Sequence, residues 1–207
     1  VSKGSYQCEL NILYPFSLVS TDSTEQAIHI RPAYWFMYNM FAIARNNSKF
    51  LKRDKRVVKE QHIETDPLAP DTVQEILFAL ERLINLTAHE LEDNDKWFAR
   101  QETDRYQSAK DYLHKNPEAD LILKDSECMK RYGAKILKPA QGYREYRKVT
   151  KYFAVKALAG WAENAGVEVL DMTCFKEIEK LPLYTSWVNL GGQVIPEEKL
   201  NELFAAI

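Results

Sequence analysis

Two runs of lysine and arginine have the spacing of a helix face, and together they could bind an anion. In residues 31–56, five cations fall within a sector about 100° wide on a helix: Arg45, Lys49, Lys52, Arg53 and Arg56. A second run repeats at i, i+3, i+4 and i+7 and consists of Arg144, Arg147, Lys148 and Lys151. Guanidinium and ammonium groups gathered in this way suit a phosphorylated small molecule or a nucleotide sugar.

The position of the two runs in the fold decides between two interpretations. If folding brings them face to face, we expect one anion-binding surface formed by Arg45, Lys49, Arg53, Arg144, Arg147 and Lys151. The alternative is an ordinary solvated helix face, partly paired with the acidic stretch over residues 90–104. The sequence does not indicate a cofactor.

A second group of polar residues lies between Gln61 and Pro70. His62, Glu64 and Asp66 are weak candidates for acid or base catalysis, because a loop held by rigid neighbours often carries such groups. The alternative is that they only structure the loop, which is the interpretation we favour. No second histidine lies at the spacing of a zinc site, so no metal site is predicted.

Known catalytic motifs are missing from the chain. His89-Glu90 lacks a second histidine four residues on, no serine lies in a G-x-S-x-G turn, and neither a P-loop nor a G-x-G-x-x-G motif occurs. Whether the protein is an enzyme stays undecided at this level.

Composition indicates a globular protein. The 207 residues are 45% hydrophobic and 28% charged with a net charge of −2, which argues against a dedicated nucleic-acid-binding protein. Cys8, Cys128 and Cys174 are far apart, so a reducing compartment, the cytoplasm, is expected. No apolar run reaches the roughly 18 residues of a membrane span, and no membrane association is predicted. The chain starts at Val1 and ends within an apolar helical pattern, so we expect a fragment of a longer protein.

Periodicity predicts a mainly α (α+β) fold with a few short strands. Residues 1–31 are expected to form an extended or short-strand lead-in, and residues 32–207 a mainly helical domain. Helices are predicted over residues 32–56, with a possible break at 46–48, and over 71–91, 95–114, 139–166, 174–180 and from 196 onward. Short strands are predicted within 10–16 and 27–30 and at 121–123 and 134–137, and a loop over 182–192.

The aromatic run from Tyr34 to Phe41 is apolar on nearly all sides of the predicted helix. Its simplest role is in the core, but such a helix also needs neighbours on several sides. It therefore also suggests a non-catalytic assembly module, in which the helix holds subunits together.

Several stretches of the chain are distinctive in sequence: Ser2–Tyr6, Glu9–Asn11, Arg31–Met40, Gln61–Asp66 and Trp187–Gly192. They resemble the C-terminal part of a family of large, uncharacterised bacterial proteins. In that family the N-terminal part resembles a left-handed β-helix of hexapeptide repeats, akin to sugar-nucleotide acyltransferases. The resemblance implies an accessory helical domain of a transferase-like protein, and a homo-oligomer formed through the β-helix. It carries no catalytic residue onto this chain, and fold-level association is weak evidence of function.

Overall fold

Five short strands form one mixed sheet in the computed structural model, which describes residues 2–6, 9–21, 27–93, 102–129 and 133–206. The strands are β1 (Ser2–Lys3), β2 (Leu18–Thr21), β3 (Ile28–Arg31), β4 (Ile122–Asp125) and β5 (Ala134–Leu137), in the spatial order β1-β2-β3-β5-β4. The pairs β1–β2 and β3–β5 are parallel, whereas β2–β3 and β4–β5 are antiparallel.

The sheet joins the predicted lead-in to the helical part of the chain. The sequence predicts an extended or short-strand lead-in over 1–31, and strand β3 of this segment pairs with β5, with Ile28 opposite Ala134 and Ile30 opposite Ile136. Both isoleucines are fully buried in the same core as the helices. Residues from the lead-in and from the helical part therefore share one sheet and one core, because apolar strands need a partner that lies far away in the sequence.

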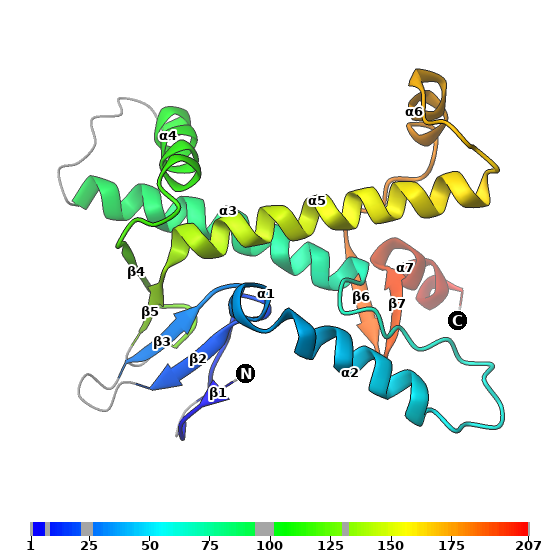
Figure 1. Ribbon diagram of the computed structural model, residues 1–207, viewed down its shortest axis with the longest axis horizontal. Helices are drawn as coiled ribbons and strands as arrows, with labels where there is room; N and C mark the ends of the chain where they lie inside the picture. Colours follow the sequence, from blue (N-terminus) through cyan, green and yellow to red (C-terminus); the bar gives the residue numbers. More distant parts are fainter. Residues whose placement is uncertain (1, 7–8, 22–26, 94–101, 130–132, 207) are drawn as a thin grey trace.

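Three helices pack together on one side of the sheet (Figure 1). They are α3 (Pro70–Asp93), α4 (Glu102–Lys115) and α5 (Pro139–Asn164). Most of the apolar residues of α3 that repeat at three and four are buried, including Ile76 and Leu83 at zero exposure, whereas Leu77 is half exposed. The helices predicted over 71–91 and 139–166 are confirmed. Of the helix predicted over 95–114, residues 95–101 lie outside the described residues, and the rest forms α4.

The aromatic helix is divided in two at Asn39, and not at the weak point that the sequence indicates over 46–48. Helix α1 (Tyr34–Tyr38) and helix α2 (Met40–Arg53) meet at Asn39, whereas the Asn46–Ser48 segment continues the helix. Ala33, before α1, has a left-handed backbone with φ of 56°, and its N–H donates to the hydroxyl of Tyr146 on α5. The hydrogen bond to α5 thus helps to fix the backbone of Ala33 at the start of α1. The low helix propensities of Asn46 and Asn47 cost only tenths of a kcal/mol each and do not break α2.

The C-terminal part contains a β-hairpin where the sequence predicts a loop. After α6 (Met172–Ile178), strand β6 (Trp187–Leu190) pairs with β7 (Gln193–Pro196), and α7 (Glu197–Ala205) follows. Gly191 and Gly192 have φ of 62° and 95°, the positive values that a two-residue hairpin turn requires. The hairpin is held on α3, because the Trp187 N–H donates to Gln74 Oε1 at 2.8 Å.

The predicted fold class, mainly helical with a few short strands, is confirmed. In the described part of the chain, no helix combines the length and the apolar character that crossing a bilayer requires.

Candidate functional site

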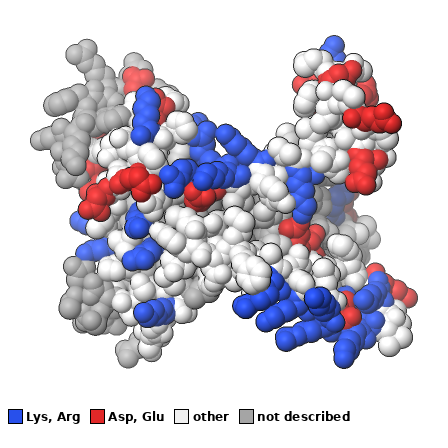
Figure 2. Space-filling model, viewed as in Figure 1, with Lys and Arg blue, Asp and Glu red and all other residues white. Residues whose placement is uncertain are grey.

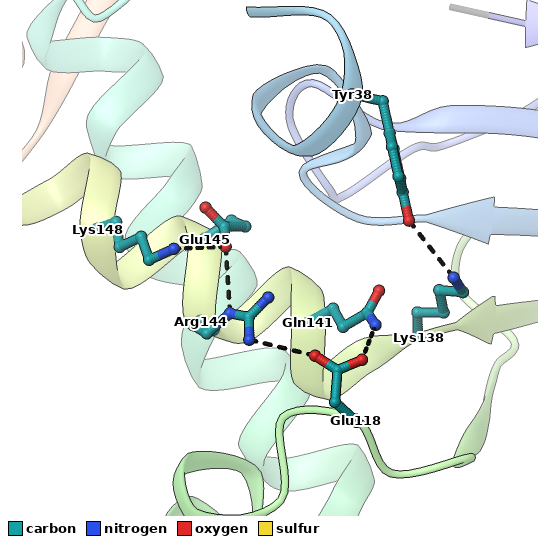
Figure 3. A network of polar contacts seen from close by, with 7 residues as sticks. All are labelled: Tyr38, Glu118, Lys138, Gln141, Arg144, Glu145 and Lys148. Atoms are coloured by element: carbon teal, nitrogen blue, oxygen red, sulfur yellow. Dashed lines mark hydrogen bonds and ion pairs between the residues drawn. The ribbon is translucent and has the colours of Figure 1, made fainter.

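The cationic run on α5 is largely occupied by contacts within the protein (Figure 3). Arg144 lies 3.3 Å from a carboxylate oxygen of Glu118 and 3.2 Å from one of Glu145. Lys148 lies 2.8 Å from the same oxygen of Glu145. Glu118 also accepts a hydrogen bond from Gln141 at 2.6 Å, which fixes the approach of the 116–121 loop to α5.

The remaining cations of this run differ in their surroundings. Arg147 places a guanidinium nitrogen 2.7 Å from Nδ1 of His114 on α4, and its guanidinium lies 5.7 Å from the ring centre of Tyr143. Lys151 is exposed and forms no ion pair within the described part of the chain. Arg144 and Arg147 thus connect α5 to its neighbours, and Lys151 is left exposed without an ion pair among the described residues.

Helix α2 differs, because its cations have no such partners. Arg45, Lys49, Lys52 and Arg53 are all exposed, and none of them is paired with a carboxylate among the described residues. Just after the helix, the carboxylate of Asp54 forms ion pairs with Arg56 at 2.8 Å and with Lys59 at 3.6 Å. The hydrogen bond from Arg56 is the main reason that the pKa of Asp54 is well below its usual value.

The two cationic runs do not form one surface. Figure 2 shows one group of blue side chains over α2 and another over α5, with uncharged surface between them. Helix α5 contacts α1, α3 and α4. On the face seen in Figure 2, the two runs therefore lie on separate elements. Within the acidic stretch, Glu92 pairs with Arg105 at 2.7 Å, and residues 94–101 lie outside the described part.

The loop with His62, Glu64 and Asp66 is tied to two other parts of the protein, the hairpin turn and α5. The Glu64 N–H donates to the carbonyl of Gly192 in the hairpin turn at 2.7 Å. One carboxylate oxygen of Glu64 accepts the backbone N–H groups of Thr65 and Asp66 at 2.8 and 2.7 Å. Asp66 accepts from the Leu68 N–H and pairs with Lys156 on α5.

These contacts match the loop-structuring alternative for the three residues. Partial burial acts to raise the pKa of Asp66, but the hydrogen bonds from Lys156 and from the Leu68 amide outweigh it and lower the pKa. His62 Nε2 lies 4.0 Å from the second carboxylate oxygen of Glu64, with the His62 side chain 84% exposed. A catalytic role for any of the three stays a prediction.

A hollow of about 480 Å³ lies between α1, α2 and this loop. Its walls combine aromatic rings, among them Trp35 and Phe50, with the amides of Asn46 and Asn47 and the carboxylate of Glu64. Sequence reasoning missed this site because it treated the two asparagines only as a weak point of the helix. The signal that could have revealed it is a pair of amides on a helix face that is otherwise apolar.

A second polar cluster is buried and structural. Asp125 has a fully buried side chain and accepts hydrogen bonds from Tyr14 at 2.7 Å, from Arg82 at 2.5 and 2.6 Å, and from the Glu127 N–H at 3.0 Å. These donors engage both oxygens of its carboxylate. Burial raises the pKa of the neighbouring Cys128 thiol to about 12, so the thiol is not a reactive nucleophile.

The described residues contain no group of three or more His, Cys, Asp or Glu side chains placed to hold a metal ion.

The comparisons with known proteins give a relative but no function. No protein-family model matches the chain, and no solved structure matches it. The chain is similar to an uncharacterized protein of Treponema pallidum (strain Nichols), with 33% identity over 214 aligned residues. The match covers all of this chain and 28% of that protein, so this chain spans little more than a quarter of the relative's length.

Proposed function

We propose that this chain is an accessory domain that binds an anionic ligand, and that α2 carries the anion-binding surface. One observation supports this most directly: the four exposed cations of α2 lack carboxylate partners within the described residues, whereas Arg144 and Arg147 contact side chains of neighbouring segments. Of the six residues proposed from the sequence, Arg45, Lys49 and Arg53 stay in the proposal, with Lys52 added.

Helix geometry gives the reason why these cations suit a phosphate group. Lys49 and Arg53 are four residues apart, as are Arg45 and Lys49, so the members of each pair lie about 5 to 6 Å apart at Cβ. Like charges at this spacing repel one another by a few tenths of a kcal/mol in the free protein. A bound anion removes that repulsion and accepts charge-assisted hydrogen bonds.

The biological setting belongs to the same proposal and comes from the resemblance. We place the domain in a cytoplasmic, sugar-nucleotide or acyl-transferase-like bacterial protein, with a phosphorylated small molecule or a nucleotide sugar as ligand. A hexapeptide β-helix outside this chain, and a homo-oligomer formed through it, remain predictions.

Thermal unfolding tests the proposal. Inorganic phosphate, a hexose phosphate, a nucleotide sugar and an acyl-CoA are each added to the protein at low ionic strength. Binding at 100 times Kd stabilises the folded state by about 2.7 kcal/mol, which appears as a higher Tm. We expect a shift with at least one of these probes.

Charge-matched variants locate the surface. Lys49→Gln with Arg53→Gln removes two exposed cations from α2, and Lys176→Gln with Lys180→Gln removes two exposed cations from α6 and the turn that follows it. The ligand-induced shift should disappear in the α2 variant and persist in the α6 variant. A shift that both variants retain, or that both lose, contradicts binding at α2.

Assembly is a second candidate, because α2 also leaves large apolar side chains in solvent. Met40, Phe41 and Leu51 are 59%, 74% and 60% exposed. If they form a contact between copies, the mass in solution rises with concentration, and Phe41→Ser abolishes that rise while Phe204→Ser on α7 does not. If a short nucleic acid binds with a steep salt dependence, the protein would instead belong to the nucleic-acid-binding class, which its near-neutral charge disfavours.

A further inference from the structure

We propose that the hollow between α1, α2 and the 61–69 loop holds a hydroxyl-bearing sugar ring whose phosphate lies against Lys49 and Arg53. This inference rests on the function proposed above, because it names the ligand class of the same helix. The argument comes from the walls of the hollow, from its unpaired polar atoms and from the helical spacing between those walls and the cations.

The size and walls of the hollow suit a small ring. Its volume of about 480 Å³ is within the range of roughly 300 to 1,000 Å³ typical of small-molecule sites. Trp35 and Phe50 give it aromatic surface, and Phe50 is 42% exposed, so part of its ring is open to a ligand. Aromatic rings beside a few fixed polar groups are the usual composition of such sites.

The polar atoms at the hollow include acceptors that a ligand hydroxyl could satisfy. Asn47 lines the hollow, and its Oδ1 is buried without a hydrogen bond among the described residues. A turn of the amide toward the hollow would let a ligand hydroxyl donate to this unpaired acceptor. Glu64 uses one carboxylate oxygen for two backbone amides, so its second oxygen can accept a ligand hydroxyl.

Helical spacing connects the hollow to the cations. Asn46 and Phe50 face the hollow. On α2, Lys49 comes three residues after Asn46, and Arg53 comes three residues after Phe50. Residues three apart are neighbours on a helix surface, so these cations lie at the rim of the hollow. The carboxylate of Glu64 lies on the loop side, where it would repel a phosphate. A ligand with hydroxyl donors at one end and a phosphate at the other fits this polarity.

The loop wall of the hollow is held in place before any ligand arrives. The Glu64 N–H is bonded to Gly192, and Asp66 is paired with Lys156 on α5. A site with fixed walls loses less conformational entropy on binding, which favours affinity for a small ligand.

Titration calorimetry at low ionic strength tests the inference with four probes: a hexose phosphate, the free hexose, inorganic phosphate and a nucleoside monophosphate. We expect the hexose phosphate to bind at least tenfold more tightly than inorganic phosphate. Asn47→Leu should weaken the hexose phosphate about tenfold or more and leave inorganic phosphate unchanged. Phe50→Ala should likewise weaken the hexose phosphate and leave inorganic phosphate unchanged, so the test does not depend on the folding of a single variant. Asn201→Leu, on the exposed face of α7, is the matched control and should change neither affinity.

The outcomes separate this inference from the proposed function. Equal affinity for hexose phosphate and inorganic phosphate, both lost in Lys49→Gln with Arg53→Gln, overturns the sugar pocket and leaves the anion-binding surface standing. Tighter binding of the nucleoside monophosphate than of the hexose phosphate overturns the sugar assignment. Failure of every phosphate-bearing probe to bind overturns both proposals.

Discussion

Removing Arg82 should expose how much the buried Asp125 carboxylate depends on one partner. The Asp125 side chain is fully buried, and the Arg82 guanidinium contacts both of its oxygens, at 2.5 and 2.6 Å. Arg82→Met keeps the length and apolar stem of the side chain but removes both hydrogen bonds and the opposite charge. Breaking a buried pair by removing one partner destabilises a protein by about 3 to 5 kcal/mol, and we expect a loss in that range at pH 7.

Two related variants give the magnitude an internal check. Tyr14→Phe removes a single hydrogen bond to the same carboxylate, so it should lower the free energy of unfolding by about 1.5 to 3 kcal/mol. Arg82→Met combined with Asp125→Leu leaves no unpaired buried charge. The double variant should therefore lose less stability than the sum of its two single variants.

The pH dependence gives a second, independent readout. Burial acts to raise the pKa of Asp125, but the hydrogen bonds from Arg82 and Tyr14 outweigh it and lower the pKa below 3.8. The contribution of the pair is thus fully present above about pH 3.8 and is lost as the pH falls through the lower folded-state pKa. In Arg82→Met the burial remains without its main compensation, so the pKa of Asp125 should rise. The gap to wild type should then shrink on acidification.

Urea unfolding at pH 7 and at mildly acidic pH measures both effects, with circular dichroism confirming that each variant folds. A loss below about 1 kcal/mol at pH 7 would refute the reasoning, because it would mean that water reaches Asp125 in place of Arg82. A gap to wild type that widens on acidification would refute the expected rise in pKa.

Three further substitutions test the packing that positions α1 and α2. Gly142→Ala should destabilise the protein by about 1 to 3 kcal/mol, since a Cβ there would lie 2.7 Å from Cβ of Pro32. Gly160 is on the same helix, and a Cβ there meets nothing within 4 Å, so Gly160→Ala should stabilise the protein by about 0.5 to 1 kcal/mol. Both are measured by urea unfolding, and equal effects at the two glycines would contradict the close approach of α5 to Pro32. Tyr146→Phe should cost about 1 to 3 kcal/mol in the same assay, because the buried hydroxyl donates to the Pro15 carbonyl at 2.5 Å, and an unchanged unfolding midpoint would show that the bond is not needed.

The long helices could be predicted because their signals are local. In α3 the apolar residues recur at three and four, and in α5 Pro139 begins the helix and Gly166, with φ of 66°, follows its end. Strand β5 was also predictable from a short apolar run. Each of these depends on residues within one or two turns, where propensity and periodicity act together.

The hairpin of β6 and β7 was missed although a local signal was present. Gly191-Gly192 between Trp187–Leu190 and Gln193–Pro196 has the two-residue spacing of a hairpin turn. The sequence analysis predicted a loop over 182–192 instead. A two-stranded hairpin is only marginally stable alone, and the hydrogen bond from Trp187 to Gln74 helps to hold this one on α3.

The sequence by itself determined the helical class of the fold and placed an exposed cationic face on α2, since charges and periodicity are properties of neighbouring residues. Only the tertiary structure decided which cations stay open to a ligand. Arg144 is engaged by Glu118, 26 residues away, and the hollow forms only where α1, α2 and the loop around Glu64 meet. Such contacts depend on how distant segments pack against a common core, and no spacing within one segment encodes that arrangement.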